Sequence, residues 1–359
     1  MASVPESGDG GGGGHGESGL HGYQFTFQAP EQGDGVHLDP RTGQRRELSE
    51  SLSESVQNFP VEFGRTYHAY RAGSYAFPND APEQERLTLQ AETLRKLFDN
   101  RLFFAPLSEK TPPRTVLDVA TGVGDWAIQM GDYFPDSEII GTDLSPIQPE
   151  HVPPNVNFYV EDSSDPWEYS KKFDYIHTRV TAGCWSSFES EIAQQAFDCL
   201  EPGGWFESQE VDSTVACDDG TLGPDSALVQ WFEEITAAGE TLNRPSVVGA
   251  LLRECYERVG FVDVQQRIFK LPVNGWAKDE SLKELGQMWE KNLLTGLSGF
   301  SYRLFNSVYG RSPAEIEVSL VDVRQDISNP KIHAFMPVYV VWGRKPYPGE
   351  GPVPTSKFQ

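Results

Sequence analysis

The stretch Arg114–Ala127, which reads RTVLDVATGVGDWA, constrains the fold of this chain more than any other. A short β-branched run ends in Asp118, small residues follow, and an amphipathic pattern begins. That order is typical of a buried strand, a tight loop and a helix N-terminus, the ligand-binding corner of a Rossmann-like α/β fold. A second strand-like run ends in Asp143, 25 residues after Asp118, close to the roughly 20-residue spacing between a glycine-rich turn and a ribose-binding acid. The two acids predict a nucleoside cofactor.

The turn after Asp118 decides which kind of nucleoside cofactor fits. It reads VATGVG, whereas a pyrophosphate binder needs G-x-G-x-x-G so that backbone N–H groups can approach an anion. The segment resembles the D-x-G-x-G-x-G signature of class I methyltransferases. That resemblance implies S-adenosylmethionine, which carries a sulfonium and an ammonium but no phosphate. A carboxylate such as Asp118 suits that ligand and would repel a pyrophosphate.

Ala120 stands where the class I signature usually has its first glycine. The extra methyl group is tolerable only if φ of Ala120 stays negative. Gly122 and Gly124 keep the other two glycine positions and are expected to let the backbone approach the ligand.

Charge and cysteine content limit the partners and the compartment. The chain has 53 acidic and 29 basic residues and a formal net charge of −24, which argues against binding to nucleic acid or an anionic membrane. The four cysteines show no metal-ligand spacing, so we expect no metal site and a reducing compartment, the cytoplasm or alternatively the nucleus. No apolar run approaches the ~20 residues of a membrane span.

The rest of the chain predicts one α/β domain between two tails. Residues 1–58 are polar and glycine-rich and are expected to be disordered, residues 59–346 form the domain, and 347–359 form a flexible tail. Strand patterns span about 114–119, 138–143, 155–160, 173–177, 200–207, 261–269 and 334–342, with helical patterns between them. Residues 272–326 are expected to insert a helical cap. The class I resemblance implies a seven-stranded, mostly parallel sheet of order 3-2-1-4-5-7-6, with helices on both faces and the last strand antiparallel.

Several further motifs resemble the fungal LaeA-like methyltransferases. They are Gly64–Tyr75, Gly141–Pro149, Leu200–Glu207 and Lys331–Phe335. The resemblance implies methylation of a small molecule in a fungal secondary-metabolite pathway. Two alternatives stay open: a regulatory subunit of a velvet-type transcription complex, with a velvet-type protein as partner, and a module that binds the cofactor without turnover.

The predicted cofactor site gathers residues from the carboxyl ends of the first three strands. Asp118 either steadies the methionine ammonium or only caps the turn, and Asp143 accepts from the ribose hydroxyls or caps a helix. Glu161 and Asp162 are expected to face the adenine, with a plain loop turn as the alternative for Asp162. Trp126 either flanks the cofactor or packs in the core. The complete set of predicted cofactor-binding residues is Tyr75, Asp118, Ala120, Gly122, Gly124, Asp143, Leu144, Glu161 and Asp162.

Methyl transfer needs positioning more than acid–base chemistry, because the cofactor's methyl group is already activated. Two residues are candidate general bases: His177, at the predicted end of the fourth strand, and Glu210, just past the fifth. A core histidine is the competing interpretation of His177. The aromatic and basic cluster within 67–75 is expected either to cover the cofactor as a lid or to pack as an N-terminal extension. Trp185, Tyr75 and Trp289 are candidate walls of the acceptor pocket.

Overall fold

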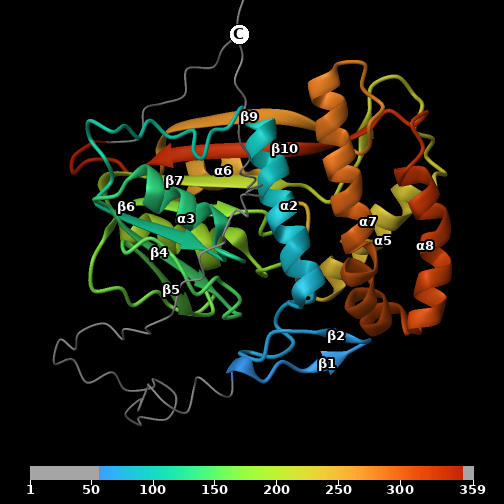
Figure 1. The fold of residues 1–359 in the computed structure, drawn as a ribbon. Coiled ribbons are helices and arrows are strands. Elements are labelled where there is room, and N and C mark those ends of the chain that lie inside the picture. Colours follow the sequence, from blue (N-terminus) through green and yellow to red (C-terminus); the bar gives the residue numbers. More distant parts are fainter. Residues whose placement is uncertain (1–55, 351–359) are drawn as a thin grey trace, which may run out of the picture.

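Residues 56–350 are described by a computed structural model, in which one mixed β-sheet organises the chain (Figure 1). The predicted tails, 1–58 and 347–359, fall largely on residues 1–55 and 351–359, which lie outside the described residues. No helix within 56–350 is long and apolar enough to cross a membrane.

The strand order of the main sheet follows the predicted topology. Its strands are β3 (Thr115–Val119), β4 (Glu138–Asp143), β5 (Val156–Val160), β6 (Phe173–Arg179), β7 (Leu200–Val211), β8 (Ala216–Cys217), β9 (Val262–Pro272) and β10 (Ala334–Arg344). The order β5-β4-β3-β6-β7-β10, with β9 on the far side of β10, is the expected 3-2-1-4-5-7-6. The first five of these strands run parallel, and β10 runs antiparallel to β7 and β9. The class I arrangement is therefore confirmed.

The strand count differs from the prediction, because the sheet has eight strands. The extra strand, β8, pairs Ala216 with Phe335 and Cys217 with Ala334. The pairing between β7 and β10 ends at Val211 and Val338, so the start of β10 leaves backbone groups open on that side. The two-residue β8 pairs with them, as buried backbone groups require.

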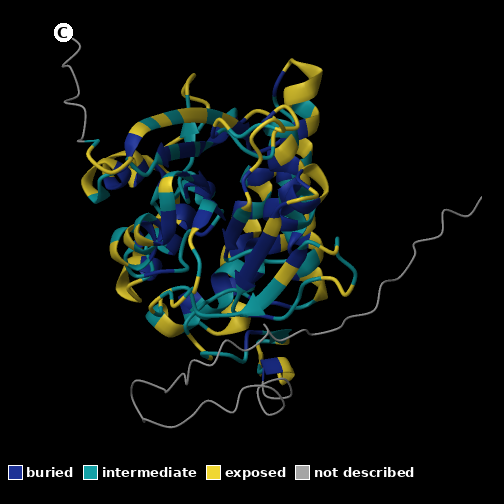
Figure 2. Cartoon of the chain, turned by 90° about the vertical axis from the view of Figure 1, so that its left-hand side faces the viewer, coloured by how far each residue is buried: buried dark blue, intermediate teal, exposed yellow. Residues whose placement is uncertain are grey.

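Helices cover both faces of the sheet because side chains alternate along each strand. Val116 packs with Trp126 and Met130 of α3 (Asp125–Tyr133) on one face. Leu117 belongs to the core of the opposite face. That face is covered by the π-helical η1 (Glu189–Ala193), α4 (Gln194–Cys199) and α6 (Leu252–Val259), which follows the 3₁₀ turn η2 (Gly249–Leu251). Figure 2 shows the buried residues concentrated between these layers.

A group of helices forms the cap beside the sheet. It consists of α2 (Ala81–Leu97), α5 (Ala227–Thr241), α7 (Glu280–Tyr309) and α8 (Pro313–Ile327). Figure 1 shows α5, α7 and α8 side by side, and their apolar faces share one core with β9 and β10. Ser312 caps the N-terminus of α8, and its side chain forms the predicted capping box with Glu315. The short strands β1 (Val61–Glu62) and β2 (Arg65–Thr66) precede α2.

The condition for a strain-free alanine at position 120, a negative φ, is not met. The loop between β3 and α3 has φ of +56° at Ala120, +61° at Gly122 and +83° at Gly124. The chain needs three left-handed residues to turn from the end of β3 into α3. Ala120 is therefore strained, since a left-handed conformation costs a residue with a Cβ about 1–2 kcal/mol.

We predict that Ala120→Gly raises the free energy of unfolding by about 1 kcal/mol, because glycine adopts a positive φ without that cost. Ala237→Gly, on the exposed side of α5, is the matched control and should lose about 1 kcal/mol through helix propensity. Urea unfolding of both variants measures the difference. A loss of stability in Ala120→Gly equal to that of the control would contradict the strained loop.

Candidate functional site

A cavity lies at the carboxyl edge of the parallel strands, and it is lined by residues from successive strands. Glu161 and Asp162 follow β5, Asp143 ends β4, Asp118 lies near the end of β3, and Arg179 ends β6. Eight of the predicted cofactor-binding residues line this cavity: Tyr75, Asp118, Ala120, Gly122, Asp143, Leu144, Glu161 and Asp162. The order of the strands therefore places the acids in a row along the cavity.

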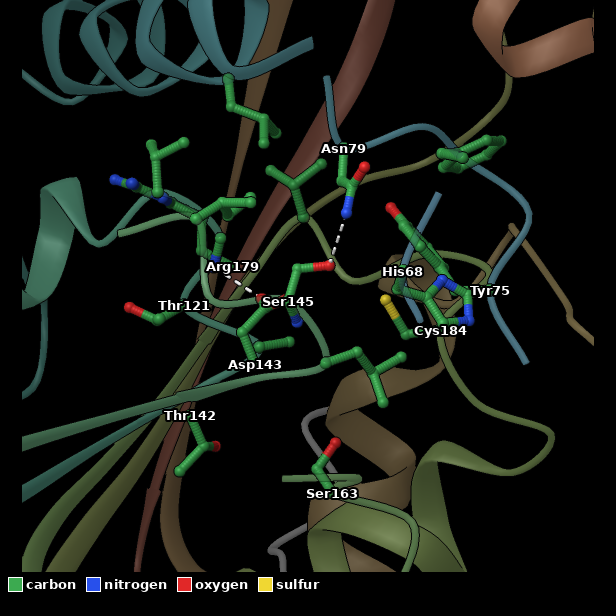
Figure 3. A pocket seen from close by; sticks show the side chains of 18 of the residues that line it. His68, Tyr75, Asn79, Thr121, Thr142, Asp143, Ser145, Ser163, Arg179 and Cys184 are labelled. Carbon is green, nitrogen blue, oxygen red and sulfur yellow. Dashed lines mark hydrogen bonds between the residues drawn. The ribbon is translucent and has the colours of Figure 1, made fainter. Parts of the chain in front are cut away.

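Asp143 lies at the centre of this row and is held by backbone donors. The amide of Gly122 donates to Oδ2 at 2.8 Å, and the amide of Ser145 donates to Oδ1 at 3.0 Å. Burial outweighs these bonds and raises the pKa of the Asp143 carboxyl to about 6. The hydroxyl of Ser145 accepts from Asn79 at 3.2 Å (Figure 3), so a residue preceding α2 is tied to the same loop. Asp143 is oriented while its oxygens keep capacity to accept from a ligand.

Asp118 is a buried junction between the loop and two strands. It is 2% exposed, its Oδ2 accepts from the hydroxyl of Thr121, and its Oδ1 lies 2.8 Å from Nδ1 of His177. Asp118 and His177 face each other in the register of β3 and β6. Asp118 thus holds the turn through the Thr121 hydroxyl rather than through a backbone amide. It also lines the cavity, where its remaining lone pairs can accept from a cation.

The acids after β5 form the other end of the row. Glu161 accepts from the hydroxyl of Tyr169 at 2.8 Å, and burial raises the pKa of its carboxyl. Asp162 accepts from the amide of Ser164 at 3.1 Å and lies 4.0 Å from Arg71. Asp162 therefore caps a loop turn and lines the cavity at once.

The segment before α2 closes the cavity from outside. In the view of Figure 3, His68, Tyr75 and Cys184 group on one side and Arg179, Thr121 and Asp143 on the other. The carbonyl of Tyr75 accepts from Arg303 of α7, and the carbonyl of Ser74 accepts from Arg244, each at 3.0 Å. These bonds fasten a lid-like segment to the helical cap.

Both candidate general bases lie outside the cavity lining, and strand length explains both placements. The fourth strand, β6, runs to Arg179 rather than to His177, so His177 is still within the strand. Its ring is fully buried and stacks on Trp126 with centroids 3.8 Å apart. The fifth strand, β7, runs to Val211, and Glu210 is buried within it. Glu210 accepts from the amide and hydroxyl of Thr181, and burial raises its pKa to about 8.

Other predicted residues are placed by packing. Gly124 caps α3, and a Cβ there would lie 2.5 Å from the ring of Phe158, so packing alone requires glycine at this position. Trp126 is buried at the cavity wall and donates to the carbonyl of Leu102. Trp185 lines the cavity, whereas Trp289 lies in the core of the cap and donates to Met336.

Sequence reasoning missed four charged residues of the lining: Glu83, Asp125, Arg179 and Arg244. Arg179 would have been found by extending the fourth strand two residues, because it then stands at the carboxyl end. Asp125 opens α3, and burial raises its pKa. Within 56–350 no group of three or more histidine, cysteine or acidic residues is arranged to hold a metal ion.

Comparisons with known proteins agree with this geometry. A protein family described as "Methyltransferase domain" matches residues 89–266. The chain is 38% identical over 298 residues to the methyltransferase pytC of Aspergillus terreus, covering 83% of this chain and 91% of that one. It is also similar to secondary metabolism regulators, at 34% identity in Cochliobolus heterostrophus (80% and 94% covered) and 32% in Monascus pilosus (86% of each).

The cavity fits S-adenosylmethionine on its own chemistry. The loop is formed in part by the positive φ of Gly122. The amide of Gly122 donates to Asp143, so it is not free to bind a phosphate. Carboxylates at the β3, β4 and β5 ends suit a cationic nucleoside with free hydroxyls. Asp143 would hold the ribose, Glu161 and Asp162 the adenine, and Asp118 the ammonium.

We predict that cofactor affinity rises as the pH increases from 5 to 7. Below about pH 6 the Asp143 carboxyl is protonated in the free protein, and it must lose that proton to accept from both ribose hydroxyls. Affinity for S-adenosylhomocysteine should fall up to about tenfold per pH unit below 6. Asp143→Asn should bind more weakly at pH 7.5, by roughly 2–3 kcal/mol, and lose the pH dependence. Calorimetry from pH 5 to 8 checks this, and a flat profile for the unaltered protein would remove Asp143 from the ribose site.

We also predict that His177 supports cofactor binding through Asp118. His177→Leu removes the donor to Asp118 and should lower cofactor affinity and melting temperature together. In His177→Asn the side-chain amide replaces Nδ1, so affinity should recover to within a few-fold of the original. Equal affinity in the leucine and asparagine variants would show that this hydrogen bond does not position Asp118.

Proposed function

The chain belongs to the fungal LaeA-like family of class I S-adenosylmethionine-dependent methyltransferases, and we propose that it methylates a small molecule of secondary metabolism. The methyltransferase pytC and the secondary metabolism regulators among its relatives support this assignment. The observation that carries it is a second cavity that adjoins the cofactor cavity.

The second cavity lies between the segment before α2, the helix α5 and the helix α7. It shares Ser74, Phe77 and Arg244 with the cofactor cavity. Its lining combines apolar and polar side chains. The apolar ones are Phe63, Ala76, Phe77, Ile235, Leu242 and Leu304, and the polar or charged ones are Glu62, Ser74, Arg244, Ser246, Arg303, Asn306 and Ser307. A chamber beside the cofactor cavity that offers both apolar surface and polar groups suits a small molecule, so we assign it to the methyl acceptor.

The proposed chemistry rests on positioning. When bound, S-adenosylmethionine supplies a methyl group carried on a positively charged sulfur. Asp143 and Asp118 orient the cofactor, and the lid segment with the cap excludes water and holds the acceptor in line. His177 and Glu210 line neither cavity, so we assign them to holding Asp118 and the loop that begins at Thr181.

A regulatory role within a velvet-type complex is the second candidate. The similarity to secondary metabolism regulators over 80% of this chain favours it. The two candidates differ in consequence: loss of an enzyme removes one methylated product, whereas loss of a regulator changes many metabolites. We propose the cytoplasm as the site of action for the enzyme and the nucleus for the regulator.

We predict that a deletion strain lacks one methylated metabolite and accumulates its unmethylated form. Reintroducing a copy of the gene that carries Ile235→Trp should not restore the product. Ile235 of α5 lines the acceptor chamber, and the larger tryptophan side chain would fill it. Cofactor affinity should stay close to that of the unaltered protein, while overpacking around the buried Ile235 lowers the melting temperature by a few degrees. Glu233→Trp, on the exposed side of the same helix, is the matched control and should restore the product.

Metabolite profiling by mass spectrometry separates the outcomes. Restoration of the product by Ile235→Trp would show that the acceptor lies outside the second cavity. A collapse of many unrelated metabolites in the deletion strain would favour the regulatory candidate.

A further inference from the structure

Arg179 is a cation without a bonded partner in the wall of the cofactor cavity. It ends β6 and lines the cavity. Its guanidinium makes no hydrogen bond or ion pair with any residue of 56–350 that the structure shows. Arg179 is half-buried, and burial lowers the pKa of its guanidinium. A guanidinium has five N–H donors in a planar fork, and these donors are available to a ligand.

The nearest acids do not satisfy this cation. Asp118 and Asp125 both favour its charge at longer range. The oxygens of Asp118 are engaged by Thr121 and His177. Oδ2 of Asp125 is buried and has no hydrogen-bond partner in the described part of the chain. In this cluster, the Arg179 guanidinium keeps unused donors and Oδ2 of Asp125 keeps an unused acceptor.

The place of Arg179 in the sheet identifies the part of the cofactor that it faces. Along the carboxyl edge the order is β5, β4, β3, β6, so the residues run from Glu161 and Asp162 through Asp143 and Asp118 to Arg179. Adjacent strands are about 4.8 Å apart. With the adenine at β5 and the ribose at β4, the amino-acid end of the cofactor reaches β3 and β6.

We propose that Arg179 binds the carboxylate of the methionine moiety of S-adenosylmethionine, beside Asp118, which faces the ammonium. This assignment rests on the proposed cofactor orientation. A zwitterionic amino acid carries one charge of each sign, and the β3 and β6 ends present one acid and one base in neighbouring positions. The planar guanidinium matches a carboxylate in a bidentate arrangement.

The packing of β6 explains why Arg179, and not His177, reaches the ligand. Tyr175, His177 and Arg179 share one face of β6 because side chains alternate. Trp126 of α3 covers this face at His177. Arg179 lies two residues further along and lines the cavity beyond this cover.

The test compares ligands that differ in the carboxylate alone. Calorimetry measures the dissociation constants of S-adenosylmethionine, decarboxylated S-adenosylmethionine and 5′-methylthioadenosine for the full chain and for Arg179→Gln. The unaltered protein should prefer S-adenosylmethionine to its decarboxylated form by about 10- to 100-fold. Arg179→Gln should lose that preference while its affinity for 5′-methylthioadenosine changes less than about twofold, and Arg179→Lys should keep part of the preference. Arg101→Gln removes the same charge from an exposed position and should keep all of it.

Three results would overturn the proposal, and they are distinguishable. If Arg179→Gln keeps the full preference for S-adenosylmethionine over its decarboxylated form, another residue binds the carboxylate, and Arg179 is free to bind an anionic acceptor. Equal weakening of all three ligands would assign Arg179 a structural role. Failure of the unaltered protein to bind any of the three would refute the cofactor site itself, and with it this assignment.

Discussion

The Asp118 carboxylate ties together the two strands and the loop on which the cavity depends. It joins β3 to β6 through His177 and fixes the loop after β3 through Thr121. Behind it, the stacked rings of His177 and Trp126 connect this junction to α3 and the core of one sheet face. A charge buried to this extent is tolerated only when it is paired and hydrogen-bonded. The same bonds that satisfy Asp118 therefore set the shape of the loop around the cofactor cavity.

The cavity concentrates features that are unfavourable for the isolated protein. Ala120 adopts a left-handed conformation, burial raises the pKa of Asp143 to about 6, and burial also lowers the pKa of the half-buried Arg179. Strain and desolvation of this kind persist where the surrounding structure holds them in place, and here the support comes from the cores on the two sheet faces. In the proposed orientation, the ribose hydroxyls of the cofactor would satisfy Asp143 and its carboxylate would satisfy Arg179. Binding and stability are thereby linked, because a ligand that binds only the folded chain stabilises it.

Much of the fold was predictable because the strand and helix patterns alternate clearly, and the order of the sheet is confirmed. The two-residue β8 was missed because so short a strand has no pattern of its own; tertiary pairing with β10 creates it. In the site, Asp118 and Asp143 were predicted from their positions at strand ends and from the spacing between them, and both line the cavity. His177, Glu210 and Arg179 depend on where β6 and β7 end, and pattern fixes strand ends only to within a few residues. The positive φ at Ala120 was not predictable either, since it follows from the path of the loop and not from the local sequence.

The central claim is that one extended cofactor lies across the carboxyl ends of β5, β4, β3 and β6, with its adenine at the first and its amino acid at the last. A crystal structure of the full chain with S-adenosylhomocysteine tests this most directly. The account predicts both ribose hydroxyls within about 3 Å of the Asp143 carboxylate, the adenine beside Glu161 and Asp162, and the amino-acid end beside Asp118 and Arg179. A ligand bound in the reverse direction, or bound away from Asp143, would contradict the account.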